Sequence, residues 1–109
     1  MHELSITESL VSAVLERIDG EVQTVTLVIG RLCGVVPDSV RFCFDVCTRG
    51  TRLEGAALEI IELPGLVRCR SCGEPGEVSD GIPLCPCGSA DLDILGGREL
   101  SIKHVEVRI

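Results

Sequence analysis

Four of the seven cysteines form two closely spaced pairs that could bind one metal ion together. Two residues separate Cys69 from Cys72, and one residue separates Cys85 from Cys87. Structural zinc takes four tetrahedral ligands, and two short cysteine turns that face each other supply four thiolates. A glycine follows each pair and lets the chain turn back, so that backbone amides can point at the sulfurs. The spacing therefore predicts a closed, structural zinc site.

Other cysteine chemistries fit this stretch less well. Two disulfides would suit an oxidising compartment, but the N-terminus lacks the basic and apolar segments of a signal peptide. A thioredoxin-like redox pair should open a helix, whereas glycine and proline follow Cys72. Catalytic zinc normally keeps an open position beside His or carboxylate ligands, and no His lies between Cys69 and Cys87. A structural site is therefore expected, with a thiol redox enzyme as a rival.

The sequence begins Met1-His2-Glu3, which could chelate a different metal ion. The α-amine, the backbone amides of His2 and Glu3 and the His2 imidazole can bind one ion through small rings. Four nitrogens in a tetragonal arrangement favour Ni(II) or Cu(II) over zinc. The amides must lose protons to bind, so binding should weaken as the pH falls. From spacing alone, His2 is more commonly a solvated terminal residue.

Five further residues carry weaker signals. Cys43 and Cys47 lie four apart on a predicted helix and could suit a metal, although buried thiols more commonly act as small apolar residues. Cys33 lies in a loop and could be exposed and reactive. Asp38 fits the start of a helix, with a ligand role as the lesser alternative. His104 is a lone histidine in a strand and is more commonly structural than a ligand.

Two helices are expected, each with a signal at its start. The first covers residues 5–19, because Ser5 and Glu8 form a capping box and apolar residues recur at helical spacing. The second opens at Pro37, a residue favoured in the first helical turn, and ends by Gly50. Each helix should present one apolar stripe to a core.

Three strands should complete this part of the chain. β-branched residues alternate through 21–30, a second strand covers 57–63, and the last covers 98–109. The apolar residues of the last strand change phase midway, so a bulge near Lys103 and His104 should return them to one face. The last strand should also rejoin the sheet of the first part of the chain.

The expected fold class is therefore α+β, with a small mixed three-stranded sheet and two helices plus an inserted four-cysteine zinc-ribbon lobe. Residues 1–66 with 96–109 would form an α/β domain that binds nickel, and residues 67–95 a zinc-binding domain. Glycine and proline at the joints should let the two parts reorient.

Composition narrows the function. The 109 residues include no Trp or Tyr and only two Phe, so the core must be thin and a metal would add stability. The formal net charge is −7, which argues against nucleic acid as a partner, since nucleic acid requires a basic surface. No apolar stretch is long enough to span a membrane, and a reducing cytoplasm is expected.

Three stretches together resemble the HypA family of nickel metallochaperones, and the resemblance covers essentially the whole chain. They are Met1-His2-Glu3-Leu4-Ser5, Ile29-Gly30-Arg31-Leu32-Cys33-Gly34-Val35-Val36-Pro37-Asp38-Ser39 and Cys85-Pro86-Cys87-Gly88-Ser89. The ribbon motif alone is generic, but its combination with the N-terminal motif is specific. Two departures stand out: Arg31 replaces the glutamate of many members, and the second cysteine pair is one residue short.

The resemblance implies a metal carrier, not an enzyme. Such proteins supply Ni(II) to the [NiFe]-hydrogenase large subunit together with the GTPase HypB. His2 would be the essential nickel ligand, beside its own amide and that of Glu3, whose side chain would tune the site. Some members recruit an aspartate at the start of the second helix as a ligand, and Asp38 lies close to that position. A homodimer is compatible with the resemblance. The zinc ligands would be Cys69, Cys72, Cys85 and Cys87. The alternative is a zinc-ribbon interaction or adaptor module.

Overall fold

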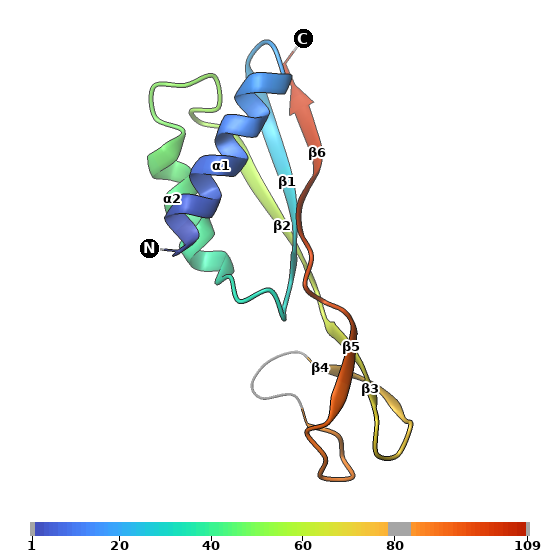
Figure 1. The fold of residues 1–109 in the computed structure, drawn as a ribbon. Helices are drawn as coiled ribbons and strands as arrows, with labels where there is room; N and C mark the ends of the chain where they lie inside the picture. The colour runs from blue at the N-terminus through green and yellow to red at the C-terminus, as the bar shows by residue number, and fades with distance from the viewer. Residues whose placement is uncertain (1, 79–83, 109) are drawn as a thin grey trace.

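The computed structural model describes residues 2–78 and 84–108, which form two lobes joined end to end (Figure 1). The α/β lobe contains α1 (His2–Arg17), β1 (Val22–Gly30), α2 (Pro37–Cys47), β2 (Ala57–Leu63) and β6 (Leu100–Val107). The cysteine lobe contains β3 (Gly65–Cys69), β4 (Pro75–Val78) and β5 (Leu92–Gly96). No helix in the described ranges is long and apolar enough to cross a membrane.

The sheet of the α/β lobe has the strand order β2-β1-β6, with β1 parallel to β2 and antiparallel to β6. Both helices cover one face of this sheet, and the last strand returns to it after the cysteine lobe (Figure 1). The expected mixed sheet with two helices is confirmed. Its core is built from aliphatic residues and one phenylalanine: Val11, Val14, Val22, Val25, Leu27, Ile29, Val35, Val40, Phe44 and Leu53.

The predicted bulge in the last strand is present. Thr26 of β1 pairs with His104 of β6, whereas the next residue, Leu27, pairs with Ile102. Lys103 is therefore the extra residue, and the bulge returns the apolar side chains to the core face. The side chains that consequently pack against the same core are Leu100, Ile102 and Val105. Ile109, expected on this face, lies outside the described residues.

The first helix begins at His2, one turn earlier than expected. Ser5 and Glu8 therefore lie inside the helix, and the capping box predicted from them is wrong. The earlier start is stabilised by Glu3, an acidic residue in the first turn, near the positive end of the helix dipole. Its carboxylate also accepts a hydrogen bond from the backbone amide of Val36, 3.4 Å away.

The other end of α1 is held by Arg52, which follows α2. Its guanidinium donates hydrogen bonds to the carbonyl oxygens of Leu15 at 2.7 Å and Ile18 at 2.6 Å. The last carbonyls of a helix have no partner within the helix and carry partial negative charge. Arg52 satisfies one of them, that of Leu15, and the carbonyl of Ile18 just after the helix, and so fixes the end of α1 to the segment that leads into β2.

The cysteine lobe is a second three-stranded sheet, of order β4-β3-β5, in which both neighbouring pairs are antiparallel. Arg70, which follows β3, braces this sheet. Its Nε and a terminal nitrogen lie 2.7 and 2.6 Å from Oδ1 of Asp93 on β5. The lobe buries few large side chains, so such cross-strand contacts and a bound metal must hold it.

The joint between the lobes is packed through glycines. The backbone amide of Leu32 donates to the carbonyl of Gly97 at 2.7 Å, and the Leu32 side chain covers Gly65 where a Cβ would stand. Gly97 has φ +101°, and a Cβ there would lie 2.5 Å from the Cα of Gly65. The joint is therefore closely packed, and reorientation of the two parts stays a prediction.

Candidate metal centre

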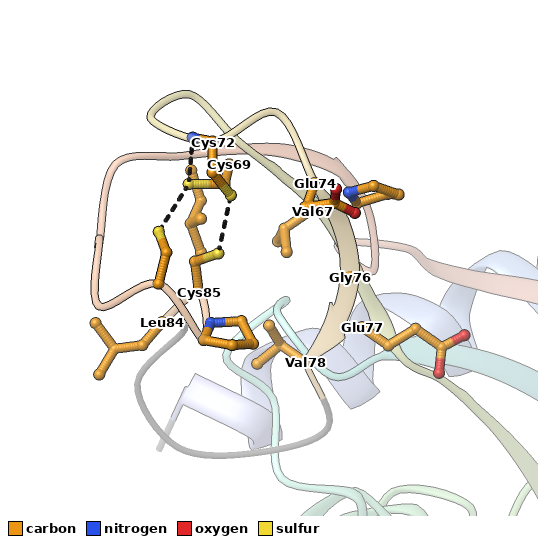
Figure 2. A pocket seen from close by; sticks show the side chains of 13 residues that line it. Val67, Cys69, Cys72, Glu74, Gly76, Glu77, Val78, Leu84 and Cys85 are labelled. Carbon is orange, nitrogen blue, oxygen red and sulfur yellow. Dashed lines mark hydrogen bonds between the residues drawn. The ribbon is translucent and has the colours of Figure 1, made fainter.

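The four predicted zinc ligands come together in the cysteine lobe (Figure 2). Their sulfur atoms all lie within 4.8 Å of one another, with Cys69 and Cys87 3.7 Å apart and Cys72 and Cys85 3.5 Å apart. Zinc–sulfur bonds of ~2.3 Å in a tetrahedron place the sulfurs about 3.8 Å apart. A disulfide needs about 2.05 Å. The spacing therefore fits four separate thiolates around one zinc ion.

The first cysteine turn follows the end of β3. The amide of Gly73 donates to the carbonyl of Cys69 at 2.8 Å, and Gly73 adopts φ +79°, which favours glycine. This turn directs the backbone amide of Cys72 at the sulfur of Cys69, 3.4 Å away. Chiefly through that hydrogen bond, the pKa of Cys69 is lowered to about 6. Cys69 is therefore largely a thiolate at neutral pH.

The second cysteine turn compensates for its missing residue by a tight bend. The amide of Gly88 donates to the carbonyl of Cys85 at 2.8 Å, and Gly88 has φ +96°. The bend brings Cys87 next to Cys69. The hydroxyls of Ser71 and Ser89 lie 3.0 Å apart and link the two turns. The short spacing is thus compatible with a four-cysteine site.

The electrostatics of the cluster favour a cation at its centre. The backbone amide of Cys87 favours the Cys85 thiolate, yet contacts with the neighbouring thiols and desolvation raise the pKa of Cys85 to about 12. Without a cation, the clustered thiols therefore compete to carry negative charge. A divalent ion removes this conflict, because it stabilises all four thiolates.

Apolar side chains border the sulfurs on one side. A hollow of about 630 Å³ lies beside the cluster, and Val67, Val78 and Leu84 line it together with the cysteines (Figure 2). Apolar surroundings limit the access of water to a metal site. Cys69 is buried and Cys85 is half-buried, whereas Cys72 and Cys87 are exposed.

The N-terminal candidate site lies at the start of α1, on the α/β lobe. His2 is exposed and Glu3 is half-buried. The first amides of a helix have no backbone carbonyl acceptor within the helix, so helix formation does not engage the amides of His2 and Glu3. The pKa of Glu3 is lowered by a hydrogen bond from its own backbone amide and then by that from Val36. The α-amine belongs to Met1, which lies outside the described residues.

Glu3 shares a hollow of about 520 Å³ with residues of α2 (Figure 1 shows α2 beside the start of α1). Asp38 and Cys43 line it as well, so the structure brings two carboxylates and one thiol to the same surface. His2 lines a different hollow, with Ser5 among its neighbours. The two carboxylates and the imidazole therefore line different hollows.

The remaining candidates are not part of either group. Cys33 and Cys47 are half-buried and pack against the core, which for Cys33 differs from the exposed thiol considered above. Burial, followed by the charge of Glu8, raises the pKa of Cys47. His104 is exposed and lies 3.5 Å from Glu106 of the same strand.

The sequence pattern does not predict several contacts around the cysteines. The Arg70–Asp93 ion pair and the Ser71–Ser89 contact support the two cysteine turns. Their members are 23 and 18 residues apart, so no local spacing pattern reveals them.

The chain matches the family described as hydrogenase/urease nickel incorporation metallochaperones, HypA, over residues 1–107. A hydrogenase maturation factor HypA from Nostoc punctiforme is 51% identical over 108 residues, which cover 98% of this chain and 96% of the relative. One from Geobacter metallireducens is 47% identical over 109 residues, with coverages of 98% and 99%.

The fold agrees with this similarity. The solution structure of the Ni metallochaperone HypA from Helicobacter pylori superimposes with a TM-score of 0.61 at 18% identity, and 96% of each chain is covered. With the whole-length family match and relatives at about half identity, this chain belongs to the HypA family of nickel metallochaperones.

Proposed function

We propose that this chain binds Ni(II) and delivers it to the large subunit of a [NiFe]-hydrogenase during maturation, together with a HypB-type GTPase. The observation that carries the proposal is the family match over residues 1–107, which includes the N-terminal Met1-His2-Glu3. The chain acts as a nickel metallochaperone of hydrogenase maturation, with partners related to hydrogenase. We place it in the cytoplasm, as a carrier without enzymatic activity, and the proposal is compatible with a homodimer.

Nickel is held in this proposal by the α-amine of Met1, the backbone amides of His2 and Glu3 and the imidazole of His2. This set supplies four nitrogens in a tetragonal arrangement, which Ni(II) prefers. Support comes from the position of both amides at the open end of α1, where no backbone carbonyl of the helix accepts from them. The Glu3 amide donates to its own carboxylate, a contact that nickel would replace. The Glu3 carboxylate tunes the site, and Asp38 lines the same hollow as a further candidate ligand.

Zinc is structural in this proposal and is bound by Cys69, Cys72, Cys85 and Cys87. The residue set is closed and all-thiolate, which suits retention of a metal and not its transfer. We divide the chain into a nickel-binding domain of residues 1–66 with 96–109 and a zinc-binding domain of residues 67–95. The separate sheet formed by strands from Gly65 to Gly96 supports this division.

The test is isothermal titration of the zinc-loaded chain with Ni(II). His2→Ala should abolish nickel binding while zinc content and the circular dichroism spectrum stay unchanged. His104→Ala is the matched control, because His104 is the other histidine and is also exposed. An N-terminal Gly-Ser extension should likewise weaken binding, since it masks the α-amine and alters no side chain. Unchanged nickel affinity in His2→Ala would remove His2 from the mechanism.

A further inference from the structure

The two phenylalanines of the chain have opposite environments although they are two residues apart on α2. Phe44 is buried in the core and 4% exposed, whereas Phe42 is 71% exposed. An aromatic side chain that is so exposed contributes little hydrophobic stabilisation to the fold of its own chain. Exposed aromatics at the centre of an apolar patch commonly mark binding surfaces, because they contribute most when a partner buries them.

Phe42 lies in such a patch. Val46, one helical turn after Phe42, is 42% exposed. Phe42 and Val46 line the hollow of about 520 Å³ that also contains Leu4 and Glu3. We call the surface formed by Leu4, Phe42 and Val46 the Phe42 face. It adjoins the proposed nickel site through Glu3.

The charges around the Phe42 face are acidic. Asp38 and Asp45 lie one turn before and one turn after Phe42 on the helix and are both exposed. Among the described residues, those that line the hollow include Glu3 and Asp38 but no Lys or Arg. Arg41, the adjacent cation, donates instead to the carbonyl of Leu58 on β2 at 3.0 Å. Arg49 lies two helical turns from Phe42, beyond the end of α2. The complementary surface is therefore apolar with basic flanks.

We propose that the Phe42 face docks the protein with which this chain exchanges nickel, through a segment that carries a bulky apolar side chain flanked by Lys or Arg. The inference rests on the proposed function, because the nickel site lies at the edge of this surface. A partner seated there has its own metal ligands within reach of the nickel site, so that the ion passes directly between proteins. A second copy of the chain is a poorer occupant, because two acidic faces repel each other.

The test uses Phe42→Ala and Asp45→Lys, with Leu95→Ala as control. Leu95 is 59% exposed but lies in the cysteine lobe. The probes are the purified HypB-type GTPase and the purified hydrogenase large subunit, each titrated against the nickel-loaded chain at low and high salt. We expect Phe42→Ala to weaken binding of at least one probe by about tenfold or more. Asp45→Lys should weaken the same complex and reduce its salt dependence, and Leu95→Ala should change neither.

Nickel titration of each variant without a partner separates this inference from the proposed function. The variants should keep wild-type nickel affinity, since Phe42 and Asp45 donate no ligand. If both probes bind Phe42→Ala as tightly as wild type, or bind neither chain, the docking surface is wrong while the nickel site stands. Self-association of the wild type that Phe42→Ala abolishes, seen by analytical ultracentrifugation, would instead assign the face to a second copy. Failure of the wild type to bind nickel would overturn the proposed function first.

Discussion

The Glu3 carboxylate accepts a hydrogen bond from the backbone amide of Val36, 3.4 Å away, which ties the first turn of α1 to the residue before α2. Residue 3 consequently has two separable roles in the proposed nickel site. Its side chain connects the N-terminus to the second helix, and its backbone nitrogen is a candidate nickel ligand. Substitutions that affect only one of these groups can measure each role.

Glu3→Ala and Glu3→Pro form the decisive pair. Alanine keeps the amide proton, so nickel should still bind, with an affinity roughly tenfold lower because the supporting carboxylate is lost. Proline is tolerated in the first helical turn but has no amide proton to lose, so the chelate loses its fourth nitrogen. We expect the affinity to fall by more than about a hundredfold. Calorimetric Ni(II) titration measures both, and equal affinities would exclude the Glu3 amide as a ligand.

The bulge of the last strand shows what a sequence pattern can predict. The apolar residues of this strand change phase between Ile102 and Val105, and one extra residue between them restores a common face. The position of the bulge could therefore be predicted from the sequence. The start of α1 could not be predicted in the same way, because Ser5 and Glu8 form a capping pattern that the structure does not use. The contact that matters instead joins Glu3 to Val36, 33 residues away.

The candidate site shows the same division. Four cysteines in two pairs predict their own assembly, since a metal that takes four ligands requires it. The hollow shared by Glu3, Asp38 and Phe42 depends on how α1 packs against α2, and neither helix encodes it alone. The exposure of Phe42 could have been suspected, because it lies off the apolar stripe that contains Val40 and Phe44.

Zinc retention should depend on pH in a defined window. The pKa of Cys69 in the folded lobe is about 6, below its ordinary value of 9. Stabilisation by this thiolate is therefore complete above pH 9 and is lost as the pH falls through about 6. Protons also compete with zinc for every ligand. We expect zinc to be retained at pH 7.5 and released progressively below about pH 6, as measured with a chromophoric zinc indicator.

Two serine variants provide the controls for zinc release. Cys87→Ser removes one of the clustered thiols and should move release to a higher pH. Cys33→Ser should leave the profile unchanged, because Cys33 packs against the core of the other lobe. A Cys87→Ser profile that superimposes on that of wild type would show that Cys87 does not bind the zinc ion.

The joint between the lobes should not tolerate a side chain at residue 97. Gly97→Ala places a Cβ 2.5 Å from the Cα of Gly65 and 2.9 Å from the carbonyl oxygen of Pro64, at φ +101°. We expect the free energy of unfolding to fall by about 2–5 kcal/mol, from backbone strain and overpacking together.

Gly34→Ala is the control, since Gly34 has φ +81° but open space around it. It should lose only about 1–2 kcal/mol. Similar losses in urea unfolding would show that the close packing at the joint contributes nothing.

Arg52 should contribute measurably to the stability of the α/β lobe. Its guanidinium supplies charged hydrogen bonds to the carbonyl of Leu15 in the last turn of α1 and to that of Ile18 just after it. Hydrogen bonds that involve a charged group contribute about 1.5–3 kcal/mol, so Arg52→Met should lower the free energy of unfolding by roughly that amount. Methionine keeps much of the apolar stem, so the loss reports the polar contacts.

Arg49→Met, at an exposed position after α2, should change stability by less than about 0.5 kcal/mol. Nickel affinity should stay constant in both variants, because Arg52 lies at the opposite end of α1 from His2. Equal stability of the two variants in urea unfolding would show that solvent replaces the guanidinium at no cost.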